Sequence, residues 1–422
     1  MCGNRRKSNR ETIVNNLIEE TETLGKPAWR PMLRYVAELH ARSTRPPRAP
    51  FPYPWEEIGP GYCYGPAFGH WDLVHASLDA MVSEPEHARQ QLLNNLAAQE
   101  ESGLLPGVIW MRDEEPRWSH EVSHPPVWPV AVQDYCTLTG SDDLIQRCYG
   151  PLVQQIRWFE ENRAALGGGF FYRDILTFQW ESGVDEGVRF FEAQPGAYAC
   201  VDASAHMFGV YQHAAAWSSL AGKAGGSAPH RGEWLEKADA LREFIQTRLW
   251  DVDSGWYYDV WAVDRPETRH LAFEGMFPLV MGAATPEQAR RVIAENLLNP
   301  RRFFSSHPIS TVGVEDPLFE LRMWRGPAWN SMTYWAVRGC LGYEQALGSL
   351  TVTAAHALLE PALDNSAAQF DRTGTVWEFY HPHGGRPEDV QRKPHTSYNQ
   401  PCRDYLGHNP LIAMARLWDR SA

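Results

Sequence analysis

Three carboxylates lie close together near the middle of the chain, at Glu181, Asp185 and Glu186. Glycines interrupt this segment, which predicts a loop and not a helix. Trp180 precedes the acids, and an aromatic wall and neighbouring carboxylates both raise the pKa of a carboxyl group. One of these acids is therefore expected to stay protonated near neutral pH and to act as a general acid. The alternative, which these residues leave open, is a solvated acidic turn.

A second candidate acid, Glu378, lies between aromatic residues just before a turn that contains proline and glycine. Hydrolysis of a glycosidic bond needs two carboxyl groups, one to protonate the leaving oxygen and one to activate water or attack the anomeric carbon. The chain is rich in the rings that pack against sugars, with 18 Trp, 16 Tyr and 17 Phe. A plain aromatic core is the alternative use of these rings.

The segment Trp180-Glu181-Ser182-Gly183-Val184-Asp185 resembles a motif of glycoside hydrolase family 63 and its mannosylglycerate hydrolase group. That resemblance implies that Asp185 is the general acid. The segment around Trp377-Glu378 is similar to the family's second motif, which implies that Glu378 is the base of an inverting mechanism. The chain departs from the family after Asp185, where Glu186-Gly187-Val188-Arg189 replaces the usual Asn-Ser-Pro-Arg.

Two further segments carry the resemblance. The pair Trp71-Asp72 matches an early loop that holds sugar hydroxyls in the family, although Asp72 also suits a helix N-cap. Residues 323–330 resemble the family's Trp-Arg-Gly-Pro-x-Trp segment, in which Arg325 faces an anion or only braces a loop. The residues expected to bind substrate are Tyr64, His70, Trp71, Asp72, Trp110, Trp180, Arg189, Trp324, Arg325, Gly326 and Trp377.

The amino-acid composition limits the classes of partner that the protein is expected to bind. The formal net charge is -13, and no basic block is longer than residues 5–7, so nucleic acid and anionic membranes are poor partners. The seven cysteines are widely spaced without a Cys-x-x-Cys pair, which favours reduced thiols and, with no apolar leader at the N-terminus, a cytoplasmic protein. No metal and no nucleotide cofactor are expected. A homo-oligomer is left open.

Helical periodicity dominates the chain and predicts an all-α fold. Since no linker poor in apolar residues divides it, residues 1–422 are expected to form one catalytic domain, with residues 1–10 as a flexible tail. The resemblance implies that the helices close into an (α/α)6 barrel with long aromatic loops at one end. Helices are expected over residues 11–23, 31–41, 72–82, 85–101, 125–135, 143–163, 202–221, 232–250, 274–281, 286–297, 327–341, 343–359 and 410–418.

Taken together, these residues and the resemblance predict an α-glycoside hydrolase that cuts a short α-glucoside or α-mannoside, such as mannosylglycerate or glucosylglycerate. A glycerate substrate needs a cation, for which Arg189 and Arg325 are the candidates. A trehalase-like or kojibiose-type disaccharidase is the second interpretation. A sugar-binding protein without turnover is the third, and an epimerase or lyase would instead centre on histidines such as His70 or His206.

Overall fold

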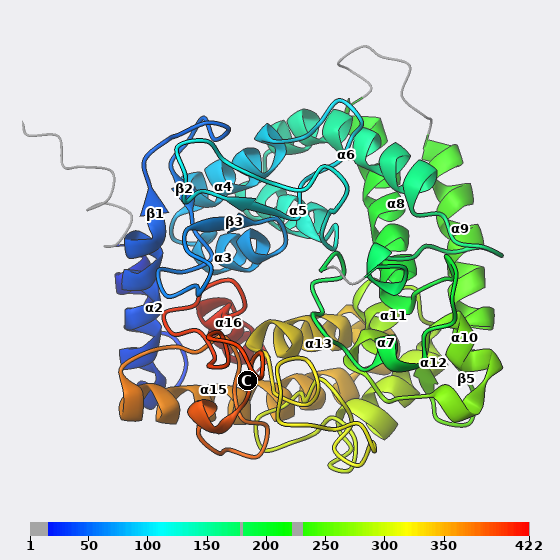
Figure 1. The fold of residues 1–422 in the computed structure, drawn as a ribbon. Helices are drawn as coiled ribbons and strands as arrows, with labels where there is room; N and C mark the ends of the chain where they lie inside the picture. The colour runs from blue at the N-terminus through cyan, green and yellow to red at the C-terminus, as the bar shows by residue number, and fades with distance from the viewer. Residues whose placement is uncertain (1–15, 178–179, 222–230, 422) are drawn as a thin grey trace, which may run out of the picture.

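The computed structural model describes residues 16–177, 180–221 and 231–421, and these are mainly helical (Figure 1). The predicted flexible tail at residues 1–10 lies outside the described residues. Three short antiparallel ladders join loop segments. They pair β1 (Thr44–Arg45) with β2 (Trp55–Glu56), β3 (Ala67–Gly69) with β4 (Val108–Trp110), and β5 (Trp250–Asp251) with β6 (Trp256–Tyr257).

Six helices form an inner ring. In chain order α3 contacts α5, α5 contacts α8, α8 contacts α11, and α11 contacts α13, while α16 returns to contact α3. Helices of this ring are buried on nearly every side, as α3 is throughout its length, because they face both the barrel interior and the outer layer. Their bounds are α3 (Asp72–Ala80), α5 (Trp128–Thr139), α8 (Val201–Ala221), α11 (Phe277–Val280), α13 (Asn330–Gly342) and α16 (Leu411–Ser421).

A second layer of helices surrounds this ring (Figure 1). These helices bury one stripe only; α9 buries Trp234, Ala238, Leu241 and Ile245, which recur at helical spacing. The alternation of inner and outer helices confirms the (α/α)6 barrel. The outer layer contains α2 (Arg30–Ser43), α4 (Pro85–Ala97), α6 (Asp143–Asn162), α9 (Arg231–Arg248), α12 (Pro286–Arg291) with a π-helix over Val292–Leu297, and α15 (Ser349–Thr373).

The largest departure from the expected helices concerns α15. Periodicity predicted one helix over residues 343–359, but Gly348 has a φ of 56° and separates a short α14 (Glu344–Leu347) from α15. Helix α15 then continues through Pro361 to Thr373, since it packs against α13 and α16 along its length. The remaining short elements are α7 (Arg189–Glu192), α10 (Val260–Asp264) and 3-10 turns at Pro27–Trp29, Arg173–Ile175, Pro266–Thr268, Phe273–Met276 and Pro387–Asp389.

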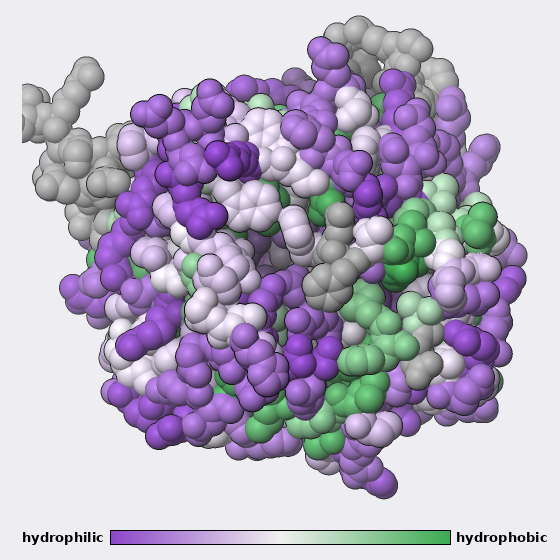
Figure 2. Space-filling model, in the orientation of Figure 1, coloured by the Kyte–Doolittle hydropathy of each residue, from purple (hydrophilic) through white to green (hydrophobic). Residues whose placement is uncertain are grey.

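The inner helices begin at one end of the barrel, and the long loops gather there. Asp72 is the first residue of α3, and Trp329 directly precedes α13. Helix N-termini carry partial positive charge, so this end favours anionic groups. Figure 2 shows this face hollowed near its middle. None of the helices in the described part of the chain is long and apolar enough to cross a bilayer.

Candidate active site

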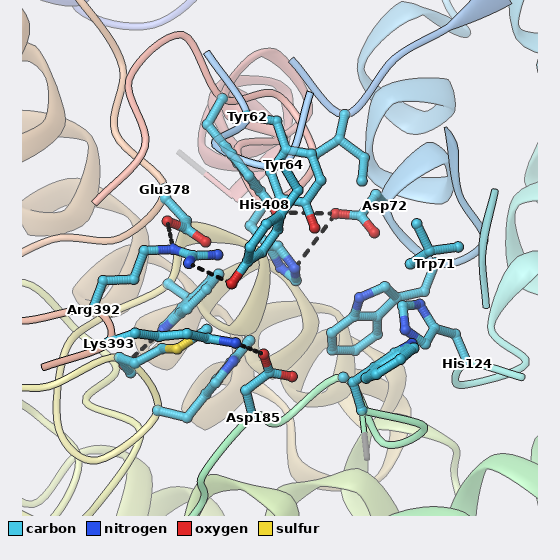
Figure 3. Close-up of a pocket in the computed structure, with 18 of the residues that line it drawn as sticks. Tyr62, Tyr64, Trp71, Asp72, His124, Asp185, Glu378, Arg392, Lys393 and His408 are labelled. Carbon is cyan, nitrogen blue, oxygen red and sulfur yellow. Dashed lines mark hydrogen bonds and ion pairs between the residues drawn. The ribbon is translucent and has the colours of Figure 1, made fainter. Parts of the chain in front are cut away.

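A pocket of about 370 Å³ opens between the loops at this end of the barrel (Figure 3). Asp185 and Glu378, the two acids predicted from the sequence, both line it, and so does Asp72. These three carboxylates come from segments that are far apart in the chain. The fold therefore brings the two acids predicted from the sequence into one cavity.

Glu378 is anchored through one oxygen. Its side chain is 2% exposed, and its Oε2 accepts hydrogen bonds from Arg392 Nε at 2.7 Å and from the backbone N of Cys402 at 3.0 Å. The backbone N of Glu378 in turn donates to the Cys402 carbonyl at 2.8 Å. Arg392 stabilises the negative charge of this carboxylate, and Oε1 is left for the pocket.

The loop that carries Asp185 is fixed by the glutamate of its own motif. Glu181 is fully buried and binds Arg163 through both oxygens, at 2.7 Å to Nε and 2.8 Å to Nη2. The backbone N–H groups of Ser123 and Arg173 also donate to this carboxylate, at 3.2 and 2.6 Å. Because both of its oxygens are occupied, Glu181 is a structural anchor and has no oxygen free for catalysis.

The next two motif residues explain why the loop needs small side chains. The Ser182 backbone N donates to Asp174 at 2.8 Å, and its hydroxyl donates to the same carboxylate. Gly183 has a φ of 75°, and a Cβ there would lie 2.7 Å from the Trp71 ring. The loop thus packs directly on Trp71, which seats Asp185 beside the aromatic wall of the pocket.

Two arginines clamp the residue that follows the acid. Glu186 has a φ of 60°; its carboxylate pairs with Arg322, and its carbonyl accepts from Arg325 Nε at 2.8 Å. On the pocket side, Lys393 Nζ donates to Asp185 Oδ2 at 3.1 Å. Burial lowers the pKa of Lys393, but its contacts with Asp185 and Tyr64 outweigh burial and raise it.

Asp72 is more buried than Asp185, with a side chain that is 6% exposed against 23%. Tyr405 donates to its Oδ1 at 3.3 Å, and His408 Nε2 lies 3.7 Å from the same oxygen. Burial raises the pKa of Asp72 to about 7. Burial also lowers the pKa of His408 well below its usual value, so this imidazole is neutral and bonds to Ser331 at 2.6 Å.

Aromatic rings form the walls. Trp324 stacks on Trp329 with ring centroids 3.8 Å apart and lies 6.4 Å from Trp71. On another side Trp110 and Trp180 meet edge to face at 5.8 Å. Of the residues expected to bind substrate, those that line the pocket are Tyr64, Trp71, Asp72, Trp110, Trp180 and Trp324.

The two arginines expected to bind an anionic substrate do not line this pocket. Arg189 is buried elsewhere, where its Nη1 donates to Asp202 at 2.9 Å and its Nε lies 3.2 Å from Asp259 and 3.5 Å from Glu274. Arg325 braces the Glu186 carbonyl and crosses an exposed aromatic ring. Arg325 therefore supports the loop that carries Asp185. Arg189 ties the start of α7 to buried acids outside the pocket.

Three other expected binding residues also lie behind the pocket. His70 is buried and bonds to Asn95 at 2.7 Å. Gly326 makes a tight turn, since a Cβ there would lie 2.5 Å from a backbone oxygen. The Trp377 indole donates to a threonine hydroxyl at 3.2 Å and is 3% exposed.

Sequence reasoning missed several lining residues, above all the cations. Arg392 and Lys393 are adjacent basic residues in a loop that lacks periodicity, and Arg112 follows the second strand of a ladder. A basic pair close after a candidate catalytic glutamate was the only signal. The pocket residues that were missed include Tyr62, Arg112, His124, Arg392, Lys393, Tyr405 and His408.

The segment His120-Glu121-Val122-Ser123-His124 has the spacing of a helix-borne zinc motif, which the sequence interpretation overlooked. In the structure this segment is irregular and not helical. His120 is exposed and bonds to Glu100, whereas His124 is buried in the pocket wall. Among the described residues, Cys200, Asp202 and Asp259 are close enough to share a metal, but the Arg189 guanidinium already lies among them.

Comparisons with known proteins agree with this geometry. A family model described as a mannosylglycerate hydrolase MGH1-like glycoside hydrolase domain matches residues 66–400. Mannosylglycerate hydrolase MGH2 of Selaginella moellendorffii is 25% identical over 169 residues, which are 36% of this chain and 31% of that protein. The periplasmic trehalase of Citrobacter koseri is 28% identical over 137 residues, 32% of this chain and 22% of that protein. The aligned part thus spans less than a third of either curated relative.

A solved structure is similar over nearly the whole chain. The GH63 mannosylglycerate hydrolase from Thermus thermophilus, in complex with Tris and D-glycerate, superposes with a TM-score of 0.65. It shares 18% identity, and the match covers 93% of this chain and 100% of that one. At this identity the likeness establishes the fold.

Proposed function

This chain belongs to the mannosylglycerate hydrolase MGH1-like glycoside hydrolase family, and from that premise we propose that it hydrolyses a short α-glucoside or α-mannoside with inversion. One observation carries the proposal. Asp185 and Glu378 line one pocket, and each is anchored through a single oxygen by a cation from residues 392–393. Each carboxylate thus keeps an oxygen for the reaction.

In this mechanism Asp185 protonates the glycosidic oxygen while Glu378 takes a proton from the attacking water. A base has to accept a proton, and the Glu378 oxygen that Arg392 leaves free is available for it. The water adds to the anomeric carbon from the face opposite the leaving group, which inverts the configuration. The sugar rests against Trp71 and Trp324, whose apolar faces suit its C–H groups.

Asp72 is proposed to hold hydroxyls of the sugar next to the scissile bond. It lines the pocket, and burial raises its pKa to about 7, so near neutral pH it can both donate and accept a hydrogen bond. The buried tyrosine and histidine beside it fix its orientation. This role is compatible with its place at the start of α3.

The leaving group is proposed to carry a carboxylate, as in mannosylglycerate or glucosylglycerate. The cations available for it are Arg112 and Lys393, which line the pocket, and not Arg189 and Arg325. The D-glycerate held by the Thermus thermophilus enzyme agrees with such a leaving group. A trehalase-like or kojibiose-type disaccharidase is the second candidate, favoured by the segment shared with the Citrobacter koseri trehalase.

The test is release of reducing sugar from mannosylglycerate, glucosylglycerate, trehalose and kojibiose, with the anomer of the first product followed by proton NMR. Turnover of a glycerate conjugate with inversion, abolished in Asp185→Asn and Glu378→Gln, supports the proposal. Glu295→Gln, which changes an ion-paired carboxylate outside the pocket, is the matched control. Saturable sugar binding with no turnover of any substrate would instead indicate a binding protein.

We also propose that residues 1–422 form one catalytic domain of a cytoplasmic protein. The helical ring closes within the described residues, through contacts of α16 with α3 and of α2 with α15. The six cysteines among the described residues are all free thiols. Limited proteolysis that divides the chain into two resistant bodies would contradict the first point, and a disulfide detected in the native cell extract would contradict the second.

A further inference from the structure

The positively charged side chains in the pocket outnumber its negatively charged ones. Arg392 is committed to Glu378, and Lys393 contacts Asp185. Arg112 lines the same pocket and has no ion-pair partner among the described residues. With Asp72 largely neutral below pH 7, the pocket carries one cation in excess, which suits a ligand with one negative charge.

Two of these cations lie along one wall. Lys393 Nζ is 5.5 Å from the centroid of the Tyr64 ring. The stem of Arg112 packs against the next residue, since a Cβ on Gly65 would lie 2.6 Å from Arg112 Cδ. Asp185 meets the same wall through Lys393 (Figure 3). Because a general acid lies on the side of the leaving group, these two cations border the leaving group as well.

The contact between Lys393 and Asp185 conflicts with the role of the acid. A general acid donates a proton, whereas Asp185 Oδ2 accepts a hydrogen bond from Lys393 Nζ at 3.1 Å, so this contact has to be given up before Asp185 can act as an acid. Neither partner is fully shielded, since the side chains are 25% and 23% exposed, so a ligand can reach both. In the free enzyme the ammonium therefore occupies an oxygen of the acid until another group binds Lys393.

We propose that Lys393 is the specificity-determining residue of this site: it binds the carboxylate of an anionic leaving group and thereby releases Asp185 to take up a proton. The inference rests on the proposed hydrolysis and on Asp185 as its acid. A neutral leaving group cannot pair with the ammonium, so Lys393 stays bound to Asp185. The charge of the leaving group therefore controls the protonation of the acid.

Lys393 is held in place for this task by the segment that also clamps the acid loop. Gln391 N donates to the Leu321 carbonyl at 3.0 Å, and Met323 N donates to the Gln391 carbonyl at 2.9 Å. Residues 321–325 supply the two arginines that hold Glu186. Residues 321–325 thus contact both the segment that carries Lys393 and the residue that follows Asp185, which fixes the position of Lys393 relative to Asp185.

Protons balance through the cycle. As the leaving-group carboxylate pairs with Lys393, Asp185 takes one proton from solvent. It passes this proton to the glycosidic oxygen as the bond to the anomeric carbon breaks. Glu378 takes a proton from the water whose oxygen forms the new bond, and it later releases that proton to solvent. The products are the free sugar and the hydroxy acid.

Other groups that face Asp185 do not replace Lys393. The pKa of His124 is lowered to about 3 by burial and by His70, and burial lowers that of His408 well below its usual value, so both rings stay neutral at working pH. Burial raises the pKa of Asp72 to about 7, so the contribution of Asp72 to a pH profile has to be identified by mutation. The charged and titratable groups around the acid are Tyr62, Tyr64, Asp72, Arg112, His124, Glu378, Arg392, Lys393, Tyr405 and His408.

The first experiment compares two substrates that differ only in this charge, α-glucosylglycerate and α-glucosylglycerol, or the mannosyl pair if that sugar is the one accepted. Wild type should prefer the carboxylate by about 100-fold in kcat/KM. Lys393→Gln should reduce the preference to about tenfold or less. For the glycerol glycoside it should raise activity and move the basic limb of the pH profile up by about one unit, since the acid keeps its proton.

Lys393→Arg should restore the preference, and Lys237→Gln, which removes a surface lysine paired with Glu160, should change nothing. A merely structural lysine would lower kcat/KM for both substrates by the same factor and leave both pH limbs in place. That result would overturn the proposal.

A second experiment does not depend on turnover. Calorimetry of D-glycerate binding near pH 7, in buffers with different ionisation enthalpies, should reveal proton uptake by wild type. Lys393→Gln should bind at least about tenfold more weakly and take up no proton, whereas Asp185→Asn should bind without uptake. No binding, or binding by wild type without uptake, overturns the role of Lys393. Proton uptake lost in both variants, with no glycoside hydrolysed, would overturn the proposed function alone.

Discussion

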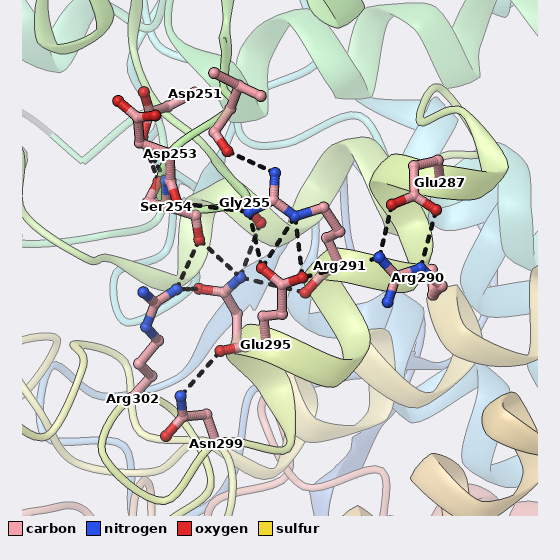
Figure 4. A network of polar contacts seen from close by, with 12 residues as sticks. Asp251, Asp253, Ser254, Gly255, Glu287, Arg290, Arg291, Glu295, Asn299 and Arg302 are labelled. Carbon is pink, nitrogen blue, oxygen red and sulfur yellow. Dashed lines mark hydrogen bonds and ion pairs between the residues drawn. The ribbon is translucent and has the colours of Figure 1, made fainter.

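The pocket and the network around Arg291 use the same chemical pair in opposite ways (Figures 3 and 4). In the network Arg291 Nε lies 3.0 Å from both oxygens of Glu295, and Nη2 lies 2.8 Å from Oε2. In the pocket Arg392 and the Cys402 N–H share one oxygen of Glu378. The network ties β5 and β6 to the π-helix, whereas the pocket keeps an oxygen free for a ligand.

The two glutamates, Glu295 and Glu378, also differ in how deeply they are buried. The side chain of Glu295 is 39% exposed, so water competes for it, whereas Glu378 is 2% exposed. An exposed ion pair adds little to stability, whereas removing one partner of a buried pair leaves an uncompensated charge. Burial alone does not set Glu378 apart, since Glu181 is fully buried too, but both oxygens of Glu181 are bound, whereas Glu378 keeps one free.

Glu378→Gln should give the largest effect. The amide cannot accept the proton of water, so kcat should fall by about 10³- to 10⁴-fold while KM changes little. The measurement is steady-state kinetics on the substrate found active, with circular dichroism to confirm that the helices persist. A variant that keeps a tenth of the activity would remove Glu378 from the role of base.

Glu181→Ala removes a buried carboxylate whose two oxygens both accept hydrogen bonds. The change leaves Arg163 buried without its partner, so the free energy of unfolding should fall by about 3 kcal/mol. Urea denaturation measures this loss. Arg163→Met in the same background should recover part of the stability, because the uncompensated charge is then gone. If the single substitution proves neutral, the anchor assigned to the acid loop is wrong.

Asp72→Asn tests how much the buried carboxyl group of Asp72 lowers the free energy of unfolding. The folded pKa of about 7 lies above the ordinary value of 3.8, so the folded state binds more protons between these values. Stability from this group is complete below about pH 4 and is lost as the pH rises through about 7. The variant should therefore be more stable than wild type by about 2 kcal/mol at about pH 8 and nearly equal at about pH 4. Equal urea midpoints at both pH values would contradict this.

Glu295→Gln should give the smallest effect. The pair with Arg291 is partly exposed, so the free energy of unfolding should change by less than about 1 kcal/mol, and the change should shrink further in salt. Activity should stay within about twofold of wild type, as the network does not reach the pocket. A large loss of activity would show that the network around Arg291 and the catalytic pocket are coupled.

The helices could be predicted because their signal is local. Apolar spacing located nearly every barrel helix within a few residues, whereas closure into a ring came from the resemblance. The predicted helix ended at residue 359, but α15 continues through Pro361 to Thr373, because packing against α13 and α16 outweighs the hydrogen bond that the proline removes. Tertiary contacts decided this case, and periodicity does not report them.

The site could be predicted only in part, for a related reason. Asp185 and Glu378 stand in segments that resemble family motifs, and that resemblance singled them out among the acids. Lys393 stands in no pattern, and its contact with Asp185 joins residues 208 positions apart. Arg189 and Arg325 were expected near the substrate because they follow motif residues, yet a side chain next to a loop can point to either side of it.

The anchoring of each pocket acid by residues near the end of the chain bears on how the protein is made. A ribosome that has synthesised Asp72 and Asp185 has yet to add Lys393, Tyr405 and the helix that returns to α3. An unfinished chain therefore holds its acids without the groups that orient them. Under the proposed roles of these acids, the site is complete only after residues 392–408 have been added, and a chain clipped before residue 392 should be inert even where its earlier helices persist.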